Sequence, residues 1–150
     1  MCSVLGAVIV MEVFVHVYVA LYFSLLYLRD RASTEYVFFA GTSLGAAVYT
    51  IGCAMLQSSG SIASSANAQQ VRYLGAAVGL ASFVHFVCRL AEERRPLLTK
   101  AISSWAVLGV AFNLVGWFYD PAFAARRSGL TWLDGRDYHE VAILPLGLVW

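Results

Sequence analysis

Charged residues are scarce in this chain, which has 10 lysines and arginines and 9 aspartates and glutamates among its 150 residues. An average soluble domain is about a quarter charged, whereas this chain is 13% charged and 60% hydrophobic. A soluble core of this size cannot hide so much apolar surface from water. The composition therefore excludes an ordinary soluble domain and predicts a protein whose solvent is the lipid bilayer.

Further absences remove whole classes of function. The net charge of +1 provides no basic field for phosphates, so we expect no nucleic-acid partner. The three cysteines form no CxxC pair, and we interpret Cys53 and Cys88, which lie in apolar runs, as packing residues. The sequence contains no HExxH metalloprotease pattern and no phosphate-binding glycine loop. We expect no catalytic residue, metal or cofactor in this chain.

The first apolar run, residues 4–28, organises the rest of the chain. At about 1.5 Å per residue, a helix of this length crosses a hydrocarbon core of about 30 Å. The run ends abruptly at Arg29-Asp30-Arg31, and it lacks the basic start and the small-residue cleavage site of a signal peptide. We therefore expect a retained transmembrane helix.

Similar apolar runs follow, separated by a short polar turn, an uncharged loop at 57–70, a charged turn at 91–100 broken by Pro96, and a mixed loop at 120–140. The last run is only about half a bilayer long. We expect the sequence to stop inside a fifth span; the alternative is a re-entrant tail. The predicted fold is an all-α, polytopic transmembrane helix bundle with four full spans and the start of a fifth, at residues 4–28, 35–56, 71–90, 101–119 and 141–150.

The basic residues are distributed unevenly among the connections between these spans. Most of them fall in the first and third connections, the second has only Arg72 at its edge, and the fourth has three arginines spread over a longer loop. By the positive-inside rule, the first and third connections face the cytoplasm and the N-terminus lies outside. We expect a multi-pass protein of the cell's inner (plasma) membrane in this orientation.

Polar side chains interrupt the predicted spans at Glu12, His16, His85 and Asn113. Glu12 and His16 lie four positions apart, hence on one helical face. Because a carboxylate in hydrocarbon needs a partner or a protein-lined site, we consider the four residues a candidate polar pocket inside the membrane. Such a pocket would receive a proton or a small molecule. In the alternative interpretation, the four side chains only hold helices together.

The two histidines among these residues, His16 and His85, lie at similar predicted depths. Two histidines at one depth could hold haem, or could hold a metal together with Glu12. Single histidines in a helix bundle are more often hydrogen-bonded packing residues, so we expect neither haem nor metal.

Two GxxxG motifs occur, at residues 41–45 and 75–79. Glycines at this spacing let another helix backbone approach closely. We expect the motifs to pack helices of one chain together; the alternative is a homodimer contact. Gly45 and Gly75 are the predicted contact points, and leucine at either position should push the helices apart.

Several segments occur in a distinctive order. The charged turn YLRDR precedes an aromatic-rich span, a small polar loop, the arginine-bearing stretch AQQVRYLGAAVGLASFVHF and, later, WFYDPAF. This order resembles the N-terminal multi-helix sensor region of bacterial membrane histidine kinases and diguanylate cyclases. The resemblance implies a membrane domain of the seven-span type, an outside N-terminus, and a kinase or cyclase that lies beyond residue 150.

The preferred function is therefore signal reception, in which a small-molecule or proton stimulus shifts helix packing and biases a cytoplasmic effector. Two other functions remain open: a haem- or metal-binding membrane redox protein, and a small structural membrane subunit. We expect the lipid bilayer as a partner, and a second copy of the chain if the GxxxG motifs face outwards.

Overall fold

The computed structural model describes residues 4–60, 62–92, 95–114, 130–131 and 137–138. All four of its helices are long and apolar enough to cross a membrane, so the predicted all-α membrane fold is confirmed. A short antiparallel strand pair lies in the segment predicted as a mixed loop. The elements in chain order are α1 (Val4–Arg29), α2 (Glu35–Gln57), α3 (Ile62–Leu90), α4 (Pro96–Leu114), β1 (Leu130–Thr131) and β2 (Asp137–Tyr138).

The predicted start of the third span is too late. The sequence predicts a loop at 57–70, but α3 begins at Ile62. Alanine and glutamine are common in this segment and are good helix formers. Ala68 is fully buried, and its carbonyl oxygen lies 3.0 Å from the place where a Cβ on Gly52 would be. The small side chains therefore extend the helix and pack it against α2.

The start of the fourth span is also earlier than predicted, because α4 begins at Pro96 within the predicted charged turn. Proline is favoured in the first turn of a helix, where its missing N–H has no partner to lose. The first two predicted spans match α1 and α2 to within one residue at each end. Residues 115–119 and the fifth predicted span, 141–150, lie outside the described residues.

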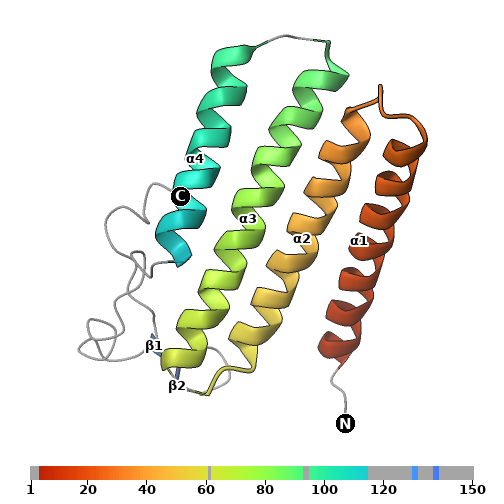
Figure 1. Ribbon diagram of the computed structural model, residues 1–150. Coiled ribbons are helices and arrows are strands. Elements are labelled where there is room, and N and C mark those ends of the chain that lie inside the picture. Colours follow the sequence, from red (N-terminus) through yellow and green to blue (C-terminus); the bar gives the residue numbers. More distant parts are fainter. Residues whose placement is uncertain (1–3, 61, 93–94, 115–129, 132–136, 139–150) are drawn as a thin grey trace.

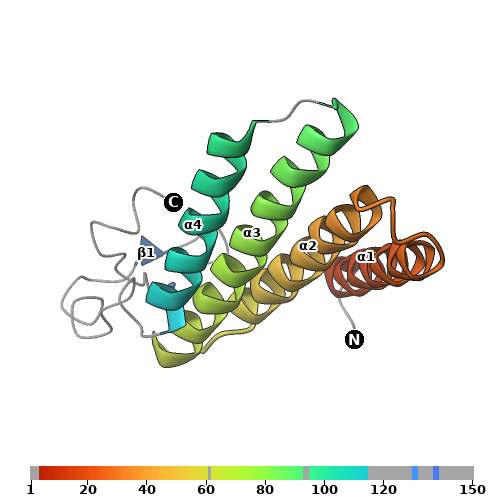
Figure 2. The same cartoon turned by 45° about the horizontal axis from the view of Figure 1, so that its top comes forward.

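The helices form a single row in chain order (Figure 1). Among the described residues, α2 contacts α1 and α3, α3 also contacts α4, and no other pair of helices meets. The same order is seen after a 45° turn, with α1 and α4 at opposite edges (Figure 2). The start of α1, the α2–α3 connection and the end of α4 lie on one side of the row, which we call the N-terminal side. The opposite side, with Arg29, Arg31 and Arg89, is called the basic side.

The edge helices expose large apolar side chains. Met11, Phe14 and Leu25 on α1, and Val107 and Leu114 on α4, are each more than 60% exposed. In water such a surface would promote aggregation, whereas in a bilayer it faces acyl chains. The pattern of exposure therefore agrees with four membrane-spanning helices.

Two kinds of contact hold the row together. Towards the basic side, the ring of Phe39 on α2 lies 4.5 Å from that of Phe23 on α1 and 5.0 Å from that of Phe86 on α3, measured between centroids. In the middle of the row, α2 and α3 meet at glycines. A Cβ added to Gly45 would lie 2.8 Å from the carbonyl oxygen of Gly75, closer than real Cβ atoms approach. The prediction that Gly45 and Gly75 are packing contacts within one chain is confirmed.

Candidate functional site

Glu12 and His16 lie together on α1, as their spacing predicts. The Glu12 Oε1 atom is 4.0 Å from His16 Nε2, and the Thr50 hydroxyl of α2 donates a hydrogen bond of 3.4 Å to the same carboxylate oxygen. Both contacts are long, and 51% of the Glu12 side chain is exposed. The carboxylate is therefore attached only loosely to α2.

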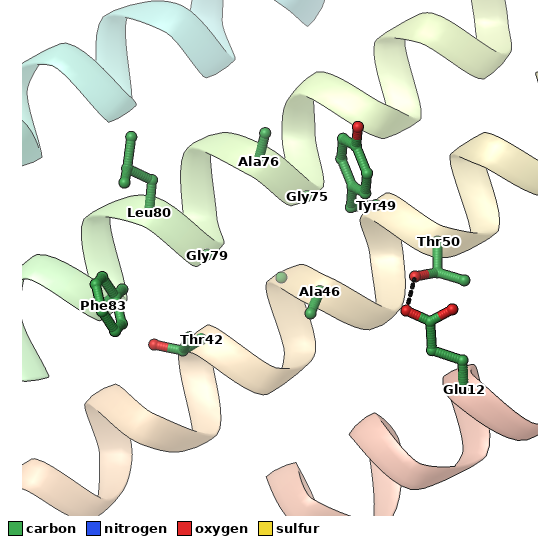
Figure 3. Close-up of a pocket in the computed structure, with 11 residues that line it drawn as sticks. Glu12, Thr42, Ala46, Tyr49, Thr50, Gly75, Ala76, Gly79, Leu80 and Phe83 are labelled. Carbon is green, nitrogen blue, oxygen red and sulfur yellow. Dashed lines mark hydrogen bonds between the residues drawn. The ribbon is translucent and has the colours of Figure 1, made fainter.

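Glu12 stands at the edge of a hollow of about 370 Å³ whose floor is formed by α2 and α3 (Figure 3). Three glycines of the contact between these helices lie in this lining and carry no side chain, whereas its large side chains are those of Tyr49, Leu80 and Phe83. We call this space the glycine hollow. Its lining consists of Glu12, Thr42, Gly45, Ala46, Tyr49, Thr50, Gly75, Ala76, Gly79, Leu80 and Phe83.

A second hollow, of about 490 Å³, is lined by residues of α2, α3 and α4. We call it the arginine hollow, because Arg72 is the one charged residue among its described lining. Arg72 Nη1 donates to Gln69 Oε1 and Nη2 donates to the Tyr49 hydroxyl, each at 3.0 Å. The guanidinium carbon also lies 5.2 Å from the centroid of the Tyr49 ring. These contacts hold the guanidinium in one orientation at the wall of the hollow.

The two hollows are adjacent, because Tyr49, Ala76 and Leu80 line both of them. We call the combined space the recess. Its charged groups, Glu12 and Arg72, each lie nearer to the N-terminal-side end of their helix than to the basic-side end. A concave space with a few oriented polar groups and a mainly apolar lining is suited to binding a small molecule.

His85 lies towards the basic side, away from the recess. Its Nε2 atom is 2.7 Å from the Ser103 hydroxyl oxygen of α4, and its ring stacks on Phe38 of α2 with the centroids 4.8 Å apart. The imidazole thus links three helices, which agrees with the packing interpretation of this residue.

Asn113 is almost completely buried and joins α4 to α3. Its side-chain amide donates to the backbone oxygen of Gln70 at 2.7 Å, and Gln70 Nε2 donates to the backbone oxygen of Asn113 at 3.3 Å. A hydrogen-bonding role between helices is therefore confirmed. Asn113 lines neither hollow.

The structure does not unite the four predicted pocket residues: it brings Glu12 and His16 together and leaves His85 and Asn113 in separate contacts. His16 lies beside Glu12 on α1, whereas His85 contacts Ser103 of α4 and Phe38 of α2, so the two histidines have different partners. Among the described residues, no group of three or more metal-ligating side chains is close enough to hold an ion. The haem or metal alternative stays a prediction.

The sequence marks Arg72 only as a topology signal at the entrance of a span, and it does not connect Arg72 with Tyr49. A usable signal is the spacing of Gln69, Arg72, Tyr73 and Ala76, which places polar and aromatic side chains on one face of α3. The partner on α2 cannot be found in this way, because the register between the two helices is set by their glycine contact.

Residues 41–45, GTSLG, also fit the GxSxG pattern of serine hydrolases. That chemistry requires the serine at a sharp strand-to-helix turn with its hydroxyl exposed. Ser43 instead lies within α2 and is buried. The motif here serves helix packing, and the geometry favours a binding site over a hydrolytic one.

No protein-family model, curated protein or solved structure matches this chain. The features that bear on function are therefore the recess and the arrangement of the helices.

Proposed function

We propose that this chain is the membrane-embedded signal-input domain of a bacterial signal-transduction protein, with a histidine kinase as the effector that the sequence resemblance implies. The N-terminal side faces outwards and the basic side faces the cytoplasm, which is the orientation that the positive-inside rule favours. In this orientation the charged groups of the recess lie in the outer half of the membrane, where an external stimulus arrives.

The observation that carries the proposal is the position of the recess across the row. The glycine hollow borders α1, α2 and α3, and the arginine hollow borders α2, α3 and α4, so an occupant of either hollow contacts three of the helices. Each helix packs only against its chain neighbours among the described residues, so no closed bundle resists a change in helix tilt. An occupant that prefers one helix spacing shifts the row towards that spacing. Because helices move as rigid bodies, the shift reaches the connections on the basic side.

A tethered occupant tests the proposal without a known ligand. Ala76 is exposed and lines both hollows. Ala76→Cys, in a chain whose native cysteines are replaced by alanine, is modified with benzyl methanethiosulfonate in lipid nanodiscs. We expect the benzyl group to change amide hydrogen exchange in the basic-side connections, near Ala32 and Ala91, because the helices shift.

Ala111→Cys is the matched control, since Ala111 is exposed on α4 and lines neither hollow. Modification at this position should leave exchange at the basic side unchanged. If the benzyl group at position 76 alters exchange only on the N-terminal side, the chain is a static structural subunit and the signal-input proposal is wrong.

A further inference from the structure

We propose that the arginine hollow binds an anionic amphiphile, a molecule with a carboxylate or phosphate head and an alkyl tail. The head lies at Arg72, and the tail runs along Leu80 and Trp105. This ligand class would be the stimulus of the recess, and that role rests on the proposed signal-input function. The binding itself requires no effector.

Contacts within the protein preorganise the site for the ligand's head group. Gln69 and Tyr49 each accept a hydrogen bond of 3.0 Å from the Arg72 guanidinium and thereby orient it. An oriented guanidinium binds a carboxylate or phosphate with little further loss of side-chain freedom. Because the Tyr49 hydroxyl accepts from Arg72, its own O–H can donate to the same anion.

The charge at this position selects an anion over a cation. The described lining of the arginine hollow contains one cation and no acidic residue, while Glu12 lines the glycine hollow. Arg72 is half-buried on a helix apolar enough to span a membrane, where charges interact more strongly than in water. An amine head would therefore be repelled.

The lining becomes apolar further along α3, which indicates that the ligand has an alkyl tail. Gln69, Arg72 and Tyr73 share one face of α3 with Ala76 and Leu80, because the five residues are spaced three or four positions apart. Leu80 lies about 12 Å beyond Arg72 along the helix axis at a rise of about 1.5 Å per residue. An alkyl chain covers this stretch and removes apolar surface from contact with water. A sugar or a free amino acid would fill only the polar end.

Equilibrium binding of radiolabelled dodecanoate and of its uncharged analogue dodecanol tests the inference. The full chain is placed in phosphatidylcholine nanodiscs, and empty discs give the background from partition into lipid. We expect saturable dodecanoate binding, about tenfold tighter than that of dodecanol, because a charge-assisted hydrogen bond is lost with the alcohol. Adding phosphatidylglycerol to the discs separates two sources of the ligand: competition indicates a membrane phospholipid, and no competition indicates a diffusible amphiphile.

Two pairs of variants locate the binding site. Arg72→Gln should abolish the preference for dodecanoate, whereas Arg89→Gln, which removes the same charge at the far end of α3, should retain it. Leu80→Trp fills the tail region while leaving Arg72 in place and should weaken dodecanoate binding. Val78→Trp, on α3 but outside both linings, should not.

Equal binding of the two probes by the wild-type chain, or an unchanged preference in Arg72→Gln, overturns the inference. If Arg72→Gln does not fold, two measurements still test the inference. One is the comparison of dodecanoate with dodecanol in the wild-type chain, and the other is the comparison of Leu80→Trp with Val78→Trp. A failure here leaves the signal-input proposal intact, since the tethered benzyl group needs no natural ligand.

Discussion

At the scale of single residues, polar side chains form hydrogen bonds between neighbouring helices. The hydroxyl of Tyr49 accepts from Arg72 between α2 and α3. Between α3 and α4, Asn113 and Gln70 each donate to the other's backbone oxygen. Inside a bilayer little water can replace such partners, so each bond stabilises the contact between two helices.

Asn113→Ala should lower the free energy of unfolding by about 1 kcal/mol, because it removes a short hydrogen bond between buried groups. The measurement is unfolding of the purified protein by SDS in detergent micelles, followed by circular dichroism. Ser104→Ala, at an exposed position of α4, is the control and should change little. Equal effects of the two substitutions would contradict a specific role for Asn113.

At the scale of the elements, the glycines between α2 and α3 are not equivalent. A Cβ on Gly45 would overlap the backbone of α3 around Gly79 and Gly75. A Cβ on Gly79 would lie 3.5 Å from the Gly45 Cα, which is an ordinary van der Waals distance. The close approach of the two helices therefore depends on Gly45 of α2 and Gly75 of α3 much more than on Gly79.

Gly45→Ala should destabilise the protein by about 1–3 kcal/mol, because α3 must move away from α2. Gly79→Ala should be neutral or stabilising, since alanine favours a helix over glycine by up to about 1 kcal/mol. Thermal unfolding in detergent measures both. A similar fall in Tm for the two variants would contradict the difference between Gly45 and Gly79.

Apolar length predicts the four helices of the described residues, because a helix that crosses a bilayer must be apolar over most of its length. The same criterion misses the start of α3 at Ile62, since small polar residues continue a helix without raising its hydropathy. For the site, Glu12 and His16 are conspicuous because charge is rare inside an apolar run. Arg72 at the end of a run is not, and its pairing with Tyr49 depends on a helix register that a linear pattern does not contain.

At the scale of the whole molecule, the orientation decides what the recess can receive. The basic side collects the arginines of two connections, whereas Glu12 and Arg72 lie towards the N-terminal side. With the N-terminal side outwards, the recess samples the outer leaflet and the medium beyond it. In the opposite orientation it would sample cytoplasmic molecules.

Cysteine labelling determines the orientation. In a background without native cysteines, Gly60→Cys should react with a membrane-impermeant maleimide added to intact cells, and Ala91→Cys should react only after the membrane is opened. Neither change alters a charge, and Gly60 has no other group within 4 Å of an added Cβ. The reverse labelling pattern would contradict the proposed orientation and, with it, an external stimulus.

The contact pattern of the row also bears on how the protein is made. Since each described helix packs only on its neighbours in the chain, α2, α3 and α4 each find one partner already synthesised when they leave the ribosome, and α1 waits only for α2. Local contacts of this kind close short loops and fold rapidly. A nascent chain stalled before α4 would already contain the glycine contact and the Arg72–Tyr49 pair. The glycine hollow would then be complete during synthesis, and the arginine hollow would lack only the wall that contains Trp105.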